Sequence, residues 1–184
     1  YTVDKNAHME VDMRKQEAIA MILAGGQGTR LSPLTTRIAK PALPFGGRHR
    51  LIDFTLSNCH NSGIATVGVL TAQQPFPLRH CLAPVAEAPA PSADCSIHVL
   101  PPGRGHSSYL GTADAVYRNI PFIERYDPDF VLVLSGDHIY RMDYAHMLEQ
   151  HKQRRAAATL AVTAVPWPEA PRFGILSLSA DGSI

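Results

Sequence analysis

The sequence has little of what marks a secreted, membrane-spanning or nucleic-acid-binding protein. It contains 3 cysteines in 184 residues, and no two of them form a CxxC pair. This argues against a disulfide framework or a cysteine zinc site and is typical of a reducing compartment. No apolar run approaches the roughly 20 residues that cross a bilayer, and the formal net charge is only +1. We therefore expect a cytoplasmic protein with neither a membrane nor a nucleic acid as its partner.

The N-terminal residues are polar and charged, and they lack the apolar stretch of a signal peptide. We interpret residues 1–17 as a disordered leader. The rest has ordinary globular composition, with 45% hydrophobic and 18% charged residues in the whole chain. Residues 18–184 are long enough to form one folded domain with its own core.

Short apolar runs alternate with helical patterns along this domain. The runs that predict strands are 18–24, 65–71, 96–100, 130–134, 157–165 and 173–178. The helices are expected over 51–61, 112–125 and 144–155, with Gly63 ending the first, Thr112 capping the second and Asp143 capping the third. A proline-rich stretch at 74–94 predicts a loop. Because the strands are apolar throughout, the fold class is α/β, with a mostly parallel central sheet covered by helices on both faces.

Ligands of such sheets bind beyond the carboxyl ends of the strands, and the first strand ends in a glycine-rich loop. The loop reads AGGQGTRL, which is neither a Rossmann fingerprint, since Leu31 replaces the third glycine, nor a P-loop, since Gly-Thr-Arg replaces Gly-Lys-Ser/Thr. Glycines alone also fit a tight turn, but Arg30 and Lys40 favour phosphate. The candidate nucleotide-binding residues in this loop are Ala24, Gly25, Gly26, Gly28 and Thr29.

A second candidate lies at the end of the fourth predicted strand. The run FVLVLSGD ends in Asp137, whose carboxylate can hold Mg²⁺, a cation that prefers oxygen ligands and bridges phosphates. We interpret the neighbouring His138 as structural. A third candidate is the start of the helix at Thr112, where the N–H groups and the positive helix end can hold a phosphate.

These residues also carry a resemblance to a known family. The runs MILAGGQGTRLSPLT and AKPALPFGG resemble the signature of sugar-phosphate nucleotidyltransferases. The runs RLIDFTLSNCHNSGI, YLGTADAVY, VLSGDHIYRMDY and RFGI, in this order, narrow the resemblance to the glucose-1-phosphate adenylyltransferases of bacteria and plants. It implies a Rossmann-like nucleotidyltransferase fold with residues 18–184 as catalytic domain. It also implies a Mg²⁺-dependent reaction of ATP with glucose 1-phosphate that gives ADP-glucose and pyrophosphate and begins glycogen and starch synthesis.

The same resemblance implies roles for individual residues. Those of the reaction centre are Arg30, Lys40 and the metal-binding Asp137. Those of the substrates are Tyr109 and Gly174 at glucose 1-phosphate and Gly111 and Thr112 near the nucleotide. Arg37, Arg50 and Arg125 match positions where family members carry basic residues that bind allosteric effectors. Without the resemblance, these three arginines would be interpreted only as exposed cations.

The sequence also departs from the family pattern. Ala72-Gln73 stands in place of a Gln-Tyr pair, and Ser108 and Leu110 replace a tryptophan and a basic residue around Tyr109. Family members continue with a Glu-Lys pair, a second metal aspartate and a C-terminal left-handed β-helix, and assemble into homotetramers or heterotetramers. We therefore expect a catalytic domain that is incomplete at its C-terminus and has little activity alone. Two alternatives stay open: a related enzyme that uses UTP, GTP or dTTP, and a non-catalytic regulatory subunit.

Overall fold

The computed structural model describes residues 16–26, 28–36, 38–72, 96–103 and 108–179, together with Gly182 and Ile184. Residues 1–15 of the predicted leader, the predicted loop at 74–94 and Arg37 lie outside the described residues. The chain divides into two compact units, Tyr1–His146 and Met147–Ile184.

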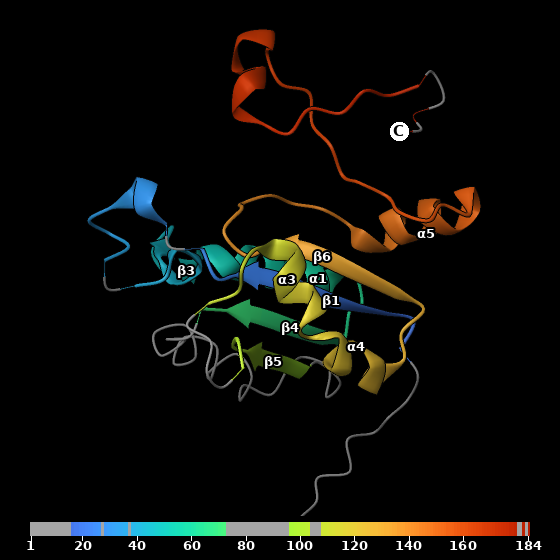
Figure 1. The fold of residues 1–184 in the computed structure, drawn as a ribbon, viewed down its shortest axis with the longest axis horizontal. Coiled ribbons are helices and arrows are strands. Elements are labelled where there is room, and N and C mark those ends of the chain that lie inside the picture. The colour runs from blue at the N-terminus through green and yellow to red at the C-terminus, as the bar shows by residue number, and fades with distance from the viewer. Residues whose placement is uncertain are drawn as a thin grey trace, which may run out of the picture. The chain divides into compact units, whose positions relative to one another are not determined.

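A four-stranded sheet forms the centre of the first unit (Figure 1). Its strands are β1 (Ala18–Ala24), β4 (Thr66–Thr71), β5 (Ser96–Leu100) and β6 (Phe130–Ser135). They lie in the order β5-β4-β1-β6, and every neighbouring pair is parallel. The four strand predictions are confirmed to within one residue at each end, and so is the prediction of a parallel α/β sheet.

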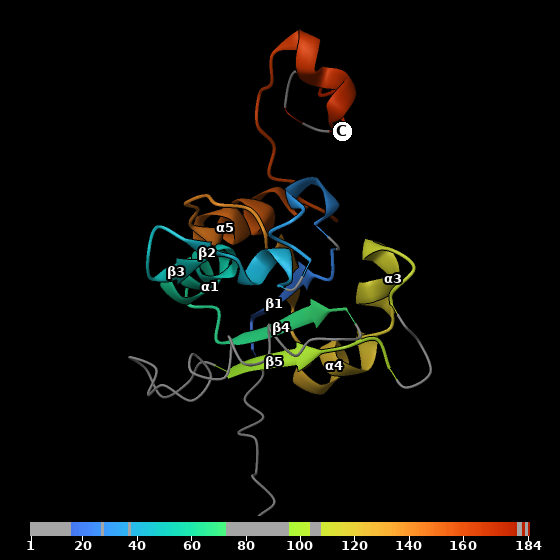
Figure 2. The same cartoon turned by 90° about the vertical axis from the view of Figure 1, so that its left-hand side faces the viewer.

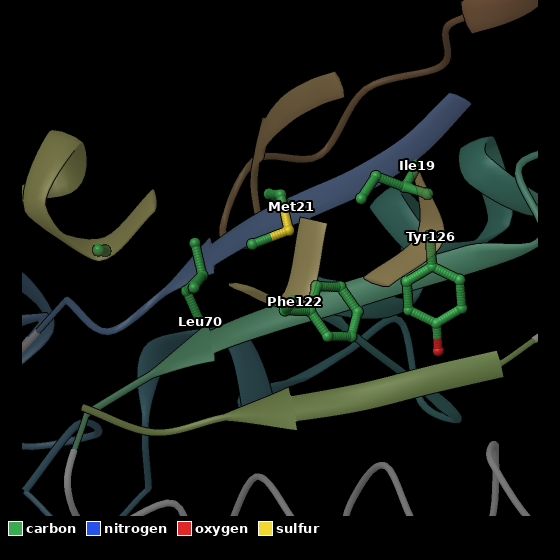
Figure 3. Packing of buried hydrophobic residues seen from close by; sticks show 6 residues of the cluster. Ile19, Met21, Leu70, Phe122 and Tyr126 are labelled. Atoms are coloured by element: carbon green, nitrogen blue, oxygen red, sulfur yellow. The ribbon is translucent and has the colours of Figure 1, made fainter. Parts of the chain in front are cut away.

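Helices cover both faces of this sheet (Figures 1 and 2). Helix α1 (Leu51–Asn61) lies on one face, and helices α3 (Thr112–Tyr117) and α4 (Ile120–Tyr126) lie on the other. Figure 3 shows the cluster beneath α3 and α4. The buried residues of this cluster are Ile19, Met21, Leu70, Ala115, Phe122 and Tyr126. Because successive side chains of β1 point to opposite faces and both faces are covered, the strand is apolar along its whole length.

The helix predicted over 112–125 is two helices, so the prediction of one continuous helix is wrong. Pro121 lies in the first turn of α4. A proline within a continuous helix removes one backbone hydrogen bond and clashes with the preceding turn, whereas the first turn tolerates it. Thr112 is also not the cap, because the first helix is preceded by Gly111 and has no side-chain cap.

The other two helix predictions in this unit are confirmed at their starts. Helix α1 occupies the predicted residues and is followed by Gly63, whose φ of 73° is a left-handed conformation that suits glycine. Helix α5 (Tyr144–Arg154) begins where Asp143 Oδ1 accepts the N–H groups of Ala145 at 2.9 Å and His146 at 3.4 Å. Asp143 is therefore the N-cap, as predicted.

Short elements connect β1 to α1. They comprise two 3₁₀ turns, η1 (Thr29–Leu31) and η2 (Lys40–Ala42), and a two-stranded antiparallel sheet of β2 (Pro44–Phe45) and β3 (His49–Arg50). Both turns belong to the stretch that carries the predicted phosphate-binding cations.

The second unit contains no strand among its described residues, so the strands predicted at 157–165 and 173–178 are wrong. The only regular element that begins in it is the 3₁₀ helix η3 (Trp167–Arg172). An extended segment becomes a strand only when its N–H and C=O groups pair with a neighbour. No such pairing is found for these segments in the part of the chain that the structure describes, and Leu160 and Val162 are 55% and 58% exposed. In the described part of the chain no helix is long and apolar enough to cross a bilayer.

One polar contact in the first unit links strand β5 to helix α4. His98 Nε2 lies 2.9 Å from the Tyr126 hydroxyl, and the His98 ring packs on Phe122 with a centroid distance of 5.2 Å. Burial, and to a smaller degree the positive charge of Arg125, lower the pKa of His98 below its ordinary value of 6.5. The folded protein therefore binds this proton less readily than the unfolded chain does.

We predict that this histidine makes the fold less stable in mild acid. Because the pKa of His98 is lowered on folding, the contribution of neutral His98 to the free energy of unfolding is fully present above pH 6.5. This contribution is lost as the pH falls towards the folded pKa. Urea unfolding at pH 7.5 and 5.5 measures the effect, and His98→Gln is expected to reduce the difference between the two pH values. His60→Gln changes an exposed histidine on α1 and serves as the control. An equal pH difference in wild type and His98→Gln would contradict the prediction.

Candidate active site

The strand order reverses at β1, and this reversal places two loops at one edge of the sheet. Strand β1 pairs with β4 on one side, where Ala24 lies beside Thr71, and with β6 on the other, where Leu23 lies beside Ser135. All three strands are parallel, so their carboxyl ends meet at the same edge. A crevice outside such a reversal is where open parallel sheets bind their ligands. The glycine loop after β1 and Asp137 after β6 both lie at this edge.

An ion pair joins the two loops across 97 residues of sequence. Lys40 Nζ donates to Asp137 Oδ2 at 2.9 Å, and Ser135 Oγ donates to Asp137 Oδ1 at 2.6 Å. Burial by itself raises the pKa of Asp137, but the hydrogen bonds from Lys40 and Ser135 and the charge of Lys40 outweigh it. The pKa of Asp137 is therefore lower than its ordinary value, and the carboxylate is ionised at neutral pH.

The backbone of the glycine loop turns sharply at Gly28. Its φ of 64° is left-handed, and a Cβ there would lie 2.8 Å from Thr35 Cγ2 and 3.1 Å from Lys40 Cβ. The Gly28 carbonyl accepts the Leu31 N–H at 2.9 Å and the Thr35 hydroxyl at 2.8 Å. This turn starts η1 and leaves Arg30 exposed to solvent.

A pocket of about 340 Å³ opens between the sheet edge and helix α3. The predicted site residues that line it are Ala24, Gly25, Gly26, Tyr109, Gly111, Thr112 and Asp137. Its volume falls within the range of small-molecule sites. The structure thus brings the glycine loop, the start of α3 and the strand-end carboxylate around one cavity.

Tyr109 lines this pocket, but its hydroxyl is used within the protein. The hydroxyl donates to the Leu100 carbonyl at 3.0 Å and accepts from Asn119 Nδ2 at 2.9 Å. Burial raises the pKa of Tyr109. Both hydrogen bonds hold the residue between β5 and the helical region, so the hydroxyl is already engaged.

Other predicted site residues do not line the pocket. Gly28, Thr29 and Arg30 lie in the adjoining turn, and Lys40 reaches the pocket only through Asp137. Gly174 belongs to the second unit.

The two described arginines predicted at effector positions lie on opposite faces of the sheet. Arg50 precedes α1, where Asp53 Oδ2 accepts its backbone N–H at 2.7 Å, and Arg125 lies on α4.

Several residues of the site were not predicted from the sequence. Those that complete the pocket are Leu23, Pro41, Leu70, Ala72, Ser108, Ala115 and Ser135. The strand-end rule that indicated Asp137 also applies to Ser135 and Ala72. Gly136 is a further omission, because a Cβ there would lie 2.9 Å from Ile22 Cγ2 and 3.1 Å from the Leu23 carbonyl oxygen. Only glycine lets the turn before Asp137 approach β1 so closely.

The donor atoms at this edge suit a divalent metal ion that prefers oxygen ligands. Asp137 offers a half-buried carboxylate in the lining of the cavity, and no group of three or more His, Cys, Asp or Glu side chains gathers within the described ranges. Magnesium usually keeps several waters and binds through one or two carboxylates and the phosphates of a substrate. A single carboxylate beside the glycine loop and Lys40 is therefore a suitable partner for such an ion.

The fold and this site are those of an enzyme class that acts on nucleotides. The family model for nucleotidyl transferases matches residues 19–184, and the chain belongs to this family. Members generally use a divalent metal ion.

Curated relatives are closely similar in sequence. A glucose-1-phosphate adenylyltransferase from Clostridium perfringens is 56% identical over 175 residues, which cover 94% of this chain and 45% of the relative. One from Geobacillus stearothermophilus is 55% identical over 173 residues, covering 92% of this chain and 45% of the relative. The chain therefore spans about half the length of the relatives it matches.

A solved structure shares the fold. It is a protein from Bacillus anthracis, assigned as a glucose-1-phosphate thymidylyltransferase and crystallised in complex with a sucrose. The TM-score is 0.58 at 20% sequence identity, covering 75% of this chain and 51% of that one. At this identity the likeness supports the nucleotidyltransferase fold.

We predict that Lys40→Met raises the pKa of Asp137. The substitution removes the hydrogen bond and the charge that lower this pKa, while the burial that raises it remains. A ¹³C NMR titration of the Asp137 carboxyl measures the shift. Arg118→Met breaks a different ion pair, with Asp114, and should leave the pKa of Asp137 unchanged. Equal values of this pKa in wild type and Lys40→Met would show that the ion pair is absent in solution.

We predict that Gly28→Ala destabilises the protein by about 1–2 kcal/mol, the cost of a left-handed conformation for a residue with a Cβ. The close approach of Thr35 Cγ2 adds to this cost. Urea unfolding measures the loss. Gly26→Ala is the matched control, because a Cβ at Gly26 meets no atom within 4 Å. Equal stability of the two variants would contradict the prediction.

Proposed function

We propose that the protein transfers the adenylyl group of ATP to glucose 1-phosphate, giving ADP-glucose and pyrophosphate for glycogen or starch synthesis. The observation that carries the proposal is the ion pair between Lys40 and Asp137, because Asp137 lines a pocket whose wall also includes Gly25 and Gly26 of the glycine loop. The sequence identity of 51–56% with proteins named glucose-1-phosphate adenylyltransferase supports the choice of ATP. The proposal concerns the whole protein, since the chain spans less than half the length of these relatives.

The reaction is a direct displacement at the α-phosphorus. A phosphate oxygen of glucose 1-phosphate forms a new bond to this phosphorus, while the bond to the bridging oxygen of the β-phosphate breaks and pyrophosphate leaves. Such a transfer needs positioning and charge stabilisation rather than a covalent intermediate. The exposed Gly25 and Gly26 and the start of α3 face the pocket, where their backbone N–H groups bind the phosphates.

The charged residues have separate tasks in this proposal. Arg30 and Lys40 stabilise the negative charge of the triphosphate. When the nucleotide binds, Lys40 moves from Asp137 to a phosphate oxygen, because a more highly charged anion competes for its ammonium group. Asp137 would then be free to hold Mg²⁺, which would supply charge neutralisation at the α-phosphate and at the leaving pyrophosphate.

The remaining proposed site residues belong to the substrates and effectors. Tyr109 and Gly174 are proposed at glucose 1-phosphate, and Gly111 and Thr112 near the nucleotide. Because the Tyr109 hydroxyl is bonded to Leu100 and Asn119, its ring is the part that faces the sugar. Binding of phosphorylated effectors at Arg37, Arg50 and Arg125, and assembly into a tetramer, extend the proposal.

The test is ADP-glucose formation by the product of the full reading frame that encodes this chain. Asp137→Asn removes the metal-binding charge, and we expect the rate to fall by about 100-fold or more. Asp143→Asn is the matched control, since asparagine caps a helix as well as aspartate does and the α5 N-cap is retained. Equal rates for Asp137→Asn and Asp143→Asn would overturn the role of Asp137. Faster turnover with UTP, GTP or dTTP than with ATP would replace the adenylyl assignment.

A further inference from the structure

The segment that carries Asp137 is held from outside by one helix. Residues 136–143 follow β6, precede α5 and contain no helix or strand of their own. Three polar side chains of α1 and its C-terminal end lie beneath this segment: Thr55, Asn58 and Ser62. Their spacing of three and then four residues places them on one side of a helix.

Each of the three side chains forms a hydrogen bond with the backbone of the segment or of the residue directly before or after it. Thr55 Oγ1 donates to the Ser135 carbonyl at 2.9 Å, and Ser62 Oγ accepts the Tyr144 N–H at 2.8 Å. Between them, Asn58 Nδ2 donates to the Tyr140 carbonyl at 3.0 Å, and Asn58 Oδ1 accepts the Met142 N–H at 3.4 Å. The backbone is therefore held on both sides of Asp137.

Several of the residues that form these hydrogen bonds are buried. Thr55 is fully buried, Asn58 is 6% exposed and Tyr144 is 1% exposed. When one partner of a buried hydrogen bond is lost, the other is left unsatisfied at a cost larger than the net value of the bond. The hydroxyls of Tyr140 and Tyr144 are also hydrogen-bonded to each other. The segment is thus attached at its start, middle and end.

Asn58 is the centre of this arrangement, because it alone bonds both an N–H and a carbonyl of the segment. A carboxylate that binds a metal must be held in place by its surroundings, and outer-shell residues do this in metal sites. We propose that Asn58 is a positioning residue: through the backbone at residues 140–142 it fixes the loop that presents Asp137 to the metal. The inference rests on the proposed function, since it assumes that Asp137 binds the ion.

The test compares Asn58→Ala with Asn61→Ala in the full reading frame that encodes this chain. Asn61 is exposed on the same helix and is the matched control. Electron paramagnetic resonance measures the affinity for Mn²⁺, used in place of Mg²⁺, with ATP present. We expect Asn58→Ala to weaken Mn²⁺ binding by about tenfold, while Asn61→Ala leaves it unchanged. Affinity within twofold of wild type in Asn58→Ala would overturn the inference.

Two further measurements keep the outcomes separate. Hydrogen exchange should be faster in Asn58→Ala at residues 138–143 and unchanged in β1, which shows that the effect is local.

If Asn58→Ala does not fold, Thr55→Val and Ser62→Ala decide instead. Each loses one hydrogen bond and is expected to weaken Mn²⁺ binding by about fivefold, and unchanged binding in both would overturn the inference. A wild-type protein that forms no ADP-glucose would overturn the proposed function, whereas normal turnover with unchanged Mn²⁺ affinity in the variants would overturn the positioning role alone.

Discussion

The site depends on parallel pairing at both edges of strand β1. The chain builds β4 and β5 on one side of β1 and then returns to place β6 on the other. Because every pair is parallel, the residues that follow β1, β4 and β6 emerge at one edge. The glycine loop and Asp137 are more than 100 residues apart in sequence, and only this pairing lets Lys40 reach Asp137. The helix that covers one face, α1, also holds the segment after β6, so scaffold and site share the same contacts.

Much of this fold could be predicted because the relevant signals are local. The run AIAMILA, stopped by Gly25 and Gly26, indicates a strand buried on both faces, and β1 is such a strand. The wrong predictions arise where a sequence pattern is necessary for a strand or helix but is not sufficient to form it. Residues 157–165 are apolar and β-branched, but a strand also requires a partner, and none pairs with them among the described residues. The helix predicted over 112–125 had a continuous apolar stripe, but Pro121 required a new start.

The candidate site was predictable at its strand ends and at the start of α3, whereas the contacts between its side chains were not. Asp137 was indicated by the rule that polar residues after parallel strands gather at one edge, and the rule needs only the strand boundaries. Its partner was not predictable, because no spacing in the sequence links Lys40 to a residue 97 positions away. The direction of the Tyr109 hydroxyl, towards Leu100, likewise depends on packing between β5 and the helices. In the sequence, Thr55 and Asn58 look like ordinary polar positions of a helix, because only the folded structure places residues 135–142 beside them.

Two kinds of interaction with different strengths meet at Asp137. The ion pair with Lys40 is partly exposed, with side-chain exposures of 31% and 37%, and such pairs contribute little net stability because water competes for both charges. The hydrogen bonds from Thr55 and Asn58 start from buried side chains, and breaking one leaves that buried side chain without its partner. Under the proposed function, a ligand replaces Lys40 at low cost while the backbone around Asp137 stays in place. Under the proposed function this division is what the chemistry requires, since the charges must exchange partners during each turnover and the carboxylate that receives the metal must not move.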